Sequence, residues 1–230
     1  MSSKIILFST SQTTHTLIEI MDSNLRPTKP NIIGILDDNS LKQSKTFYGI
    51  NVIGKFNEIK KIVTSENITS FGIGLAAVKH MHIKNALFNY CIKLGLQPIQ
   101  CISNRAYISA DTQIGNGQLV LPNSFIGVST KIADNCSIHA NVSILENCNI
   151  GFNSLVASNS FIGGNSTIEE NVYIGPGCTI GSGVTIRKNS IVGAGTTIIK
   201  DIPENSMVYG FPNITKSNNH YLSAPEWMKA

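Results

Sequence analysis

Aliphatic residues recur at every sixth position throughout the second half of this chain. The series runs without a slip over sixteen positions: Ile108, Ile114, Val120, Ile126, Ile132, Ile138, Ile144, Ile150, Val156, Ile162, Ile168, Ile174, Ile180, Ile186, Val192 and Ile198. A period of six fits neither an α-helix nor an ordinary alternating strand, and it is typical of a hexapeptide β-helix. In such a fold three six-residue sides make one coil, and each Ile or Val points inward. The sequence therefore predicts a triangular prism of about five coils over residues 103–200.

Small residues mark the expected corners of this prism. Glycine follows the inward residue at Gly115, Gly127, Gly151, Gly163, Gly175, Gly181 and Gly193. We expect these glycines to adopt the tight conformations that corners require, because a residue without Cβ is least restricted. Asn and Asp near the corners are expected to tolerate left-handed geometry for a related reason; they are Asn116, Asp134, Asn153, Asn165 and Asn189. The unbroken register predicts no long inserted loop.

Residues 1–102 follow a different pattern, in which short apolar runs alternate with helix-like segments. The strand-like runs are 5–8, 32–36, 70–74 and 98–101, and the helix-like segments lie around 17–21, 56–63 and 83–94. This alternation predicts parallel βαβ units in a small Rossmann-like α/β domain. Residues 201–230 leave the hexapeptide pattern and form a C-terminal tail. Its aromatic residues Phe211, Tyr221 and Trp227 indicate that it packs against a surface, with a partner subunit as one candidate.

Composition excludes several classes of function. The net charge of +4 is small and the basic residues are scattered, so we expect neither nucleic-acid nor membrane binding. The five cysteines include no CxxC pair and are interpreted as reduced core residues of a cytoplasmic protein. The first apolar run, Ile5 to Phe8, is too short for a signal peptide or a membrane span. His80 and His82 have no further ligands in register, so no metal site is predicted.

Several segments, spread over nearly the whole chain, form a recognisable set. They are 4–8, 34–38, 71–74, the hexapeptide series and 191–212. In this combination they resemble the bacterial sialic acid O-acetyltransferase and nucleotide-amino-sugar N-acetyltransferase family. The resemblance implies a left-handed β-helix, a homotrimer, acetyl-CoA as co-substrate, and acetyl transfer to a nucleotide-linked amino sugar in surface glycan biosynthesis, such as that of lipopolysaccharide. The hexapeptide series is common to many acyltransferases, and Asp37-Asp38 narrows the resemblance to this family.

The resemblance also implies where the nucleotide sugar binds. Ser11, Gln12 and Thr13 fall on the family's substrate-binding positions in the first βα loop. In the family that loop is glycine-rich and accepts phosphates on backbone N–H groups at a helix N-terminus. Here the stretch from Ser9 to Thr14 contains no glycine. Its hydroxyl and amide groups are still able to donate hydrogen bonds, and the alternative is an ordinary helix N-cap cluster.

The resemblance implies three more substrate-binding positions. Asp37 and Asp38 fall where the family holds the nucleotide base or ribose, and the alternative is a turn that ends a strand. Gly74 falls on a substrate-contact position where a missing side chain allows close approach. Its alternative is a strand-end glycine without a binding role.

The family's catalytic base is absent from its usual position. Family members place a histidine in a sequence like Glu-His-Glu/Asp-Cys-x-Ile-Gly. Aligned on Cys148 to Gly151, Glu146 occupies the histidine position and Asn147 replaces the acidic residue that would orient it. We assign Asn147 to the substrate-binding set.

Two residues are candidates to replace the missing base. Glu146 serves if burial beside the sugar makes its carboxylate basic enough. His139, seven residues earlier, lies on the adjoining side and needs little tuning to accept a proton. Each has an ordinary alternative, Glu146 as a solvated wall residue and His139 as an exposed corner residue.

A third possibility requires no strong base. An amino group with a pKa of about 8 is partly neutral at pH 7 and needs only to be oriented. Loss of the histidine therefore favours N-acetylation over the alternative, O-acetylation of a sugar hydroxyl. A further alternative is a catalytically silent homologue that binds a nucleotide sugar or acts as a scaffold.

The resemblance implies acetyl-CoA contacts along the later coils. They fall on Leu155, Pro176 and Ala194, with Gly164 and Gly193 nearby. Leu155 replaces a family histidine, and Pro176 keeps its carbonyl but has no N–H. The alternative is that these residues only pack the walls and corners.

Overall fold

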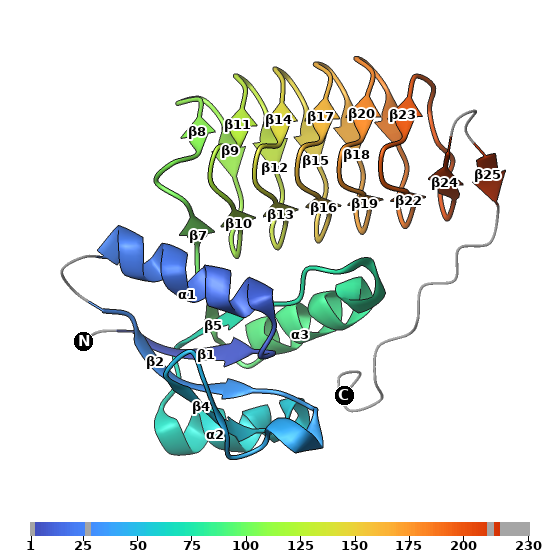
Figure 1. The fold of residues 1–230 in the computed structure, drawn as a ribbon. Helices are drawn as coiled ribbons and strands as arrows, with labels where there is room; N and C mark the ends of the chain where they lie inside the picture. The colour runs from blue at the N-terminus through green and yellow to red at the C-terminus, as the bar shows by residue number, and fades with distance from the viewer. Residues whose placement is uncertain (1–2, 26–28, 211–213, 217–230) are drawn as a thin grey trace. The chain divides into compact units, whose positions relative to one another are not determined.

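The computed structural model describes residues 3–25, 29–210 and 214–216. The chain divides into two compact units between Cys101 and Ile102 (Figure 1). The tail residues Phe211, Tyr221 and Trp227, for which packing was predicted, lie outside the described residues.

The first unit is built on a mainly parallel sheet. Its strands, in spatial order, are β3 (Thr46–Phe47), β4 (Ile50–Gly54), β2 (Asn31–Leu36), β1 (Lys4–Phe8), β5 (Ser70–Ile73) and β6 (Gln97–Pro98). Only β3 runs antiparallel to its neighbour. The helices are α1 (Gln12–Leu25), α2 (Ile59–Glu66) and α3 (Met81–Lys93), with short 3-10 helices η1 (Ser40–Lys42), η2 (Phe56–Glu58) and η3 (Val78–His80). The predicted alternation of strands and helices is therefore present.

Two details of this unit differ from the expectation. The sequence pattern did not identify β4, in which Val52 and Gly54 are buried between exposed residues. The expected last strand, 98–101, is divided between β6 and β7 (Cys101–Ile102), and β7 pairs within the β-helix. Pro98 does not interrupt the ladder, because the nitrogens of Gln97 and Ile99 donate to the carbonyls of Thr69 and Phe71 at 3.0 Å and 2.9 Å. The centre of the sheet is β1, where Ile6, Leu7 and Phe8 are fully buried.

The second unit is a parallel β-helix with three sides of two-residue strands. Side 1 contains β8 (Tyr107–Ile108), β11 (Phe125–Ile126), β14 (Ser143–Ile144), β17 (Phe161–Ile162), β20 (Thr179–Ile180) and β23 (Thr197–Ile198). Side 2 contains β9 (Gln113–Ile114), β12 (Lys131–Ile132), β15 (Asn149–Ile150), β18 (Thr167–Ile168) and β21 (Thr185–Ile186). Side 3 runs through β7, β10 (Leu119–Val120), β13 (Ser137–Ile138), β16 (Leu155–Val156), β19 (Tyr173–Ile174), β22 (Ile191–Val192) and β24 (Met207–Tyr209), and ends at β25 (Ile214–Lys216).

The hexapeptide prediction is confirmed position by position. Each of the sixteen predicted inward residues is the second residue of one of these strands. Strands pair in register with the strand one coil later, as in Ile126 with Ile144 and Ile144 with Ile162. From Val120 onward the inward residues are buried in one continuous core. This stack of short parallel strands fits a left-handed β-helix.

The glycines that follow the inward residues have a different role from the one expected. Their φ angles lie outside the left-handed region. A Cβ added to Gly151 would lie 2.5 Å from the carbonyl carbon of Glu169 in the next coil, and one added to Gly163 would lie 2.5 Å from the nitrogen of Ser182. Glycine occurs here because adjacent coils approach closely. The prediction of special corner conformations at these glycines is therefore wrong.

From Val120 onward the left-handed corner residues lie three positions before each inward residue, and most are asparagines. Asn153, Asn165 and Asn189 adopt φ of 58°, 63° and 59°, as expected, whereas Asn116 and Asp134 do not. Asparagine tolerates this conformation, and its amide adds a bond between coils. The Asn153 side chain, for example, donates to Oδ1 of Asn171 at 2.8 Å.

A second row of small residues lies two positions before the inward ones. The hydroxyl of Ser154 donates to the carbonyl of Glu169 at 2.7 Å and accepts from the nitrogen of Val172 at 3.0 Å. Cys136, Cys148 and Cys178 occupy equivalent places and are buried, free thiols, as the sequence predicted. Burial raises the pKa of the Cys148 and Cys178 thiols, so neither is an activated nucleophile.

Candidate functional site

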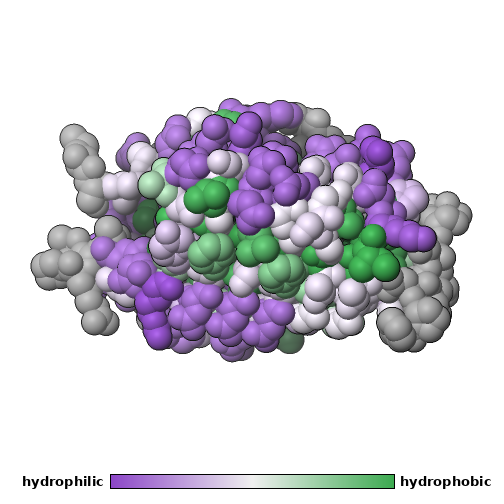
Figure 2. Space-filling view, turned by 90° about the horizontal axis from the view of Figure 1, so that it is seen from above, coloured by the Kyte–Doolittle hydropathy of each residue, from purple (hydrophilic) through white to green (hydrophobic). Residues whose placement is uncertain are grey.

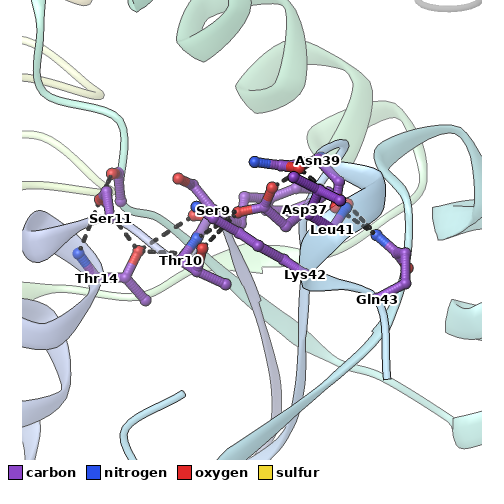
Figure 3. Close-up of polar contacts among 11 residues, drawn as sticks. Ser9, Thr10, Ser11, Thr14, Asp37, Asn39, Leu41, Lys42 and Gln43 are labelled. Carbon is purple, nitrogen blue, oxygen red and sulfur yellow. Dashed lines mark hydrogen bonds and ion pairs between the residues drawn. The ribbon is translucent and has the colours of Figure 1, made fainter. Parts of the chain in front are cut away.

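The first βα loop is closed by Asp37, the first residue after β2 (Figure 3). Asp37 Oδ2 accepts from the nitrogen and the hydroxyl of Thr10, both at 2.7 Å, and Oδ1 accepts from the nitrogen of Asn39 at 2.9 Å. Lys42 Nζ lies 3.6 Å from Oδ2. Both carboxylate oxygens of Asp37 are therefore used inside the chain. Thr10 and Lys42 belong to this cluster although the sequence analysis did not name them.

The chemistry of Asp37 follows from these contacts. Burial on its own would raise the pKa of the carboxyl, but the hydrogen bonds from Asn39 and Thr10, together with Lys42, outweigh it. The pKa therefore lies below the ordinary value of 3.8. Asp37 is ionised at neutral pH and holds the loop after β1 against the loop after β2.

Replacing Asp37 with Asn is expected to lower the free energy of unfolding by about 2 kcal/mol at pH 7, because hydrogen bonds to a charged oxygen are lost. A depressed folded-state pKa gives stability that is complete above about pH 4 and lost as the pH falls through the folded pKa. Urea unfolding of the parent protein and of Asp37→Asn, at pH 7 and at pH 3, measures the difference in their free energies of unfolding, which should be smaller at pH 3. An equal difference at both pH values would contradict the assignment.

The missing glycines of the first loop are replaced by hydroxyl contacts. Ser9 adopts φ of 75°, a conformation that usually requires glycine. Its carbonyl accepts from the hydroxyl of Thr14 at 2.6 Å. Ser11 caps α1 by accepting from the nitrogen of Thr14 at 3.3 Å, and its hydroxyl donates to the carbonyl of Gly74. The N-cap interpretation of Ser11 is thus realised in the structure.

The space over Gly74 is filled from within the chain. A Cβ on Gly74 would lie 1.8 Å from Oγ1 of Thr14. Glycine is required here because Thr14, which is fully buried, packs directly against it. Close approach of a ligand is not needed to explain this residue.

The remaining predicted residues of this unit are more accessible. Gln12 is exposed and Thr13 half-buried on the first turn of α1. Asp38 is exposed, and its Oδ1 accepts from the nitrogen of Phe56 at 2.8 Å. The structure therefore brings Ser11, Gln12, Thr13, Asp37 and Asp38 to the carboxyl ends of β1 and β2, with Gly74 at the end of β5.

The predicted β-helix residues lie along two different corners. We name them the Glu146 corner, between sides 1 and 2, and the His139 corner, between sides 3 and 1. Glu146, Asn147 and Gly164 lie on the Glu146 corner. His139, Pro176, Gly193 and Ala194 lie on the His139 corner. The two base candidates thus lie on different corners, at opposite ends of β14.

On the Glu146 corner, the side chain of Glu146 is exposed. The burial required for a basic carboxylate is therefore not supplied by the chain's own described residues. Asn147 adopts φ of 55°, and its amide donates to Oδ1 of Asn165 at 2.7 Å. Asn147 thus has a structural role as one of the left-handed corner asparagines.

On the His139 corner, His139 is half-buried and its nitrogen donates to the carbonyl of Val156 at 2.9 Å. Pro176 and Ala194 are exposed, and Gly193 is half-buried. Leu155 differs from these residues because it lies on side 3 with only 1% of its surface exposed. The five predicted acetyl-CoA residues are therefore distributed over two corners and one side.

A shallow groove of about 770 Å³ lies on side 2, away from all these residues. Its lining includes Gln113, Lys131, Asn149, Phe152 and Glu169. None of the residues predicted to bind substrate or cofactor borders it.

Two further observations concern metal and membrane. No group of three or more His, Cys, Asp or Glu able to hold a metal ion occurs among residues 3–25, 29–210 and 214–216. His80 and His82 lie at the start of α3, where burial lowers the pKa of both imidazoles. None of the helices in the described part of the chain is long and apolar enough to span a bilayer.

Known proteins match this chain over the β-helix alone or over both units. The model of the GMPPB C-terminal domain family matches residues 102–201. No curated protein matches the chain. PerB from Caulobacter crescentus, solved with CoA and GDP-perosamine, aligns with a TM-score of 0.82 at 19% identity, over 93% of this chain and 97% of PerB.

Two other solved structures give similar alignments. The acetyltransferase domain of PglB from Neisseria gonorrhoeae, solved with acetyl coenzyme A, has a TM-score of 0.79 at 20% identity, over 93% of this chain and 99% of that domain. A mutant of GDP-perosamine N-acetyltransferase from Caulobacter crescentus has a TM-score of 0.66 at 17% identity, over 94% and 98%. The predicted resemblance is thereby confirmed for the fold: the chain has, over both of its units, the fold of the hexapeptide-repeat sugar N-acetyltransferases represented by PerB and PglB.

Proposed function

We propose that this chain is an acetyl-CoA-dependent N-acetyltransferase that modifies the amino group of a nucleotide-linked amino sugar. The observation that carries the proposal is the alignment of 93% of the chain with PerB, a structure that holds both CoA and GDP-perosamine. Because the alignment extends over both units, it includes the part that precedes the β-helix as well as the hexapeptide coils. We assign the reaction to bacterial surface glycan biosynthesis, such as that of lipopolysaccharide, in the cytoplasm.

The first unit is the proposed nucleotide-sugar-binding domain, residues 1–102, of Rossmann-like type. Support comes from its parallel strand order β4-β2-β1-β5-β6, in which α1 follows the central strand β1. In such sheets ligands bind beyond the carboxyl ends of the strands. Gln12, Thr13 and Asp38 present accessible polar groups there, while Asp37 and Ser11 hold the loops that carry them.

The reaction joins the sugar amine nitrogen to the acetyl carbonyl carbon and breaks the bond between that carbon and the CoA sulfur. The amine gives up one proton, and the departing thiolate takes up one proton. Glu146 is the proposed acceptor of the amine proton or the group that orients the amine, and His139 is the second candidate. An amino group with a pKa of about 8 needs less help than a hydroxyl, which favours N-acetylation.

Acetyl-CoA is the proposed co-substrate, contacted along the later coils of residues 103–200. Pro176 and Ala194 are exposed residues of the His139 corner, and the carbonyl of Pro176 already accepts from the nitrogen of Gly195 at 2.8 Å. Gly164 is the remaining candidate. Leu155 is the weakest candidate, because the whole residue is 1% exposed and its nitrogen already donates to the carbonyl of Val172 at 2.9 Å.

The direct test is release of the CoA thiol in the presence of UDP-, GDP- and dTDP-linked amino sugars. Turnover with an amino sugar and none with its hydroxyl analogue is the expected result. Turnover with the hydroxyl analogue would make the chain an O-acetyltransferase. No turnover with any member of the panel would favour a silent, nucleotide-sugar-binding homologue.

A homotrimer is the proposed assembly, and an apolar row on side 1 supports it. The outward residues of β8, β11 and β17 are Tyr107, Phe125 and Phe161, which are 60%, 39% and 39% exposed. Tyr107 and Phe125 stack with ring centroids 5.2 Å apart. Apolar residues gather in the middle of the face that Figure 2 presents. A second copy of the chain would remove such a row from water.

The double substitution Phe125→Glu, Phe161→Glu is expected to convert the trimer into monomers, because it places two charges in the buried interface. Light scattering measures the change, from three times the 24.9 kDa of one chain to a single chain. Asn149→Glu, on the exposed surface of side 2, is the control and should leave the trimer intact. Dissociation by Asn149→Glu but not by the double substitution would place the interface on side 2.

A further inference from the structure

The Glu146 corner contains one residue whose missing side chain determines where a carboxylate lies. Equivalent positions on this corner recur one coil apart, giving the row Val128, Glu146, Gly164, Ser182 and Lys200. Gly164 therefore lies directly beyond Glu146 along the axis of the prism.

The carboxylate of Glu146 occupies the place that a side chain at position 164 would take. A Cβ added to Gly164 would lie 2.3 Å from Oε1 and 2.8 Å from Cδ of Glu146. It would also lie 3.3 Å from the Glu146 carbonyl oxygen, a tight contact that a shift of a few tenths of an ångström relieves. The closest overlap is thus with the carboxylate, the far end of an exposed side chain that is able to move aside.

Both backbones are held by hydrogen bonds between coils, so the carboxylate is the group that yields first. The Glu146 carbonyl accepts from the nitrogen of Asn165 at 2.9 Å, and the nitrogen of Asn147 donates to the carbonyl of Val128 at 2.8 Å. The Gly164 carbonyl accepts from the nitrogen of Gly183 at 2.9 Å. Gly164 is not in the left-handed region, so alanine is conformationally acceptable there.

We propose that Gly164 is a positioning residue for Glu146, because its missing side chain leaves the room over position 164 in which the exposed carboxylate lies. This inference rests on the proposed acetyltransferase function, in which Glu146 faces the sugar amine. It differs from the assignment of Gly164 to acetyl-CoA binding, because Gly164 then acts on the reaction only through Glu146.

The test is Gly164→Ala, assayed alone and combined with Glu146→Gln. We expect Gly164→Ala to lower kcat by about tenfold or more, since small displacements of reacting groups are costly, with KM for acetyl-CoA unchanged. In the Glu146→Gln background it should have no further effect. Gly181→Ala is the matched control, because its nearest contact would be 3.3 Å away, and it should retain the parent kcat.

Other outcomes separate the two assignments. A raised KM for acetyl-CoA at unchanged kcat, or a further loss in the Glu146→Gln background, would overturn positioning in favour of cofactor contact. If the parent protein acetylates no amino sugar, the proposed function fails on its own. A crystal structure of Gly164→Ala then decides the inference: the Glu146 carboxylate should be displaced while the coil is unchanged, and an undisplaced carboxylate would overturn it.

Discussion

Replacing Glu146 with glutamine is expected to lower kcat for the amino sugar by about 100-fold, the low end of the usual contribution of a general base. Glutamine keeps the size of the side chain and its contact with Gly164 but is unable to accept a proton. KM for both substrates should change little, because the charge acts on the proton that leaves during the reaction. The rate of CoA thiol release under saturating substrates measures the effect.

His139→Asn is the comparison variant for this experiment, since the two candidates lie at opposite ends of β14. If Glu146 is the base, His139→Asn should leave kcat unchanged between pH 6 and pH 9. A large loss in His139→Asn, with a loss of less than about tenfold in Glu146→Gln, would assign the base to the histidine. Small losses in both variants would mean that the neutral amine reacts without a strong base.

Gly151→Ala is expected to be among the most destabilising single substitutions in the β-helix. The new Cβ would lie 2.5 Å from the carbonyl carbon of Glu169 and 2.6 Å from the nitrogen of Glu170. Both atoms belong to the backbone of the next coil, so the stack itself must shift. We expect a loss of about 3 kcal/mol, the upper range for overpacking in a well-packed protein.

The control for Gly151→Ala is Gly181→Ala. Both glycines follow an inward isoleucine, yet at Gly181 the nearest atom, the Ile198 carbonyl oxygen, would be 3.3 Å from the new Cβ. Thermal unfolding of the two variants should show a lowered midpoint for Gly151→Ala and a much smaller change for Gly181→Ala. Equal changes would mean that close approach between coils is not the reason for glycine at these positions.

The sequence predicted the β-helix well because its signal is local and repeated. Each inward Ile or Val occurs at the expected place, and the period of six leaves a single register for the chain. The corner chemistry was predicted less well. Gly151 and Gly163 are explained by neighbours one coil away, and that distance is not visible in a hexapeptide pattern. The left-handed role fell mainly to Asn residues such as Asn147 and Asn153.

In the first unit the sequence predicted the strands and helices but not the hydrogen-bond partners of the loop residues. The absence of glycine between Ser9 and Thr14 was evident from the sequence, but its compensation was not. Thr14 packs against Gly74, and Thr10 binds Asp37, across strands that lie far apart in the sequence. These pairs form because β1 lies between β2 and β5. Hydrogen-bond partners of that kind depend on sheet order, which apolar runs alone do not specify.

What the sequence determined by itself is the periodic architecture: a core that repeats every six residues and the absence of a histidine at position 146. Those properties follow from side-chain type along the chain. Only the tertiary structure decided which side chains are already engaged. Asp37, Ser11 and Asn147 are used in internal hydrogen bonds, and the carboxylate of Glu146 lies over Gly164. The physical reason is that these contacts join residues about eighteen or more positions apart, brought together by coil stacking and strand order.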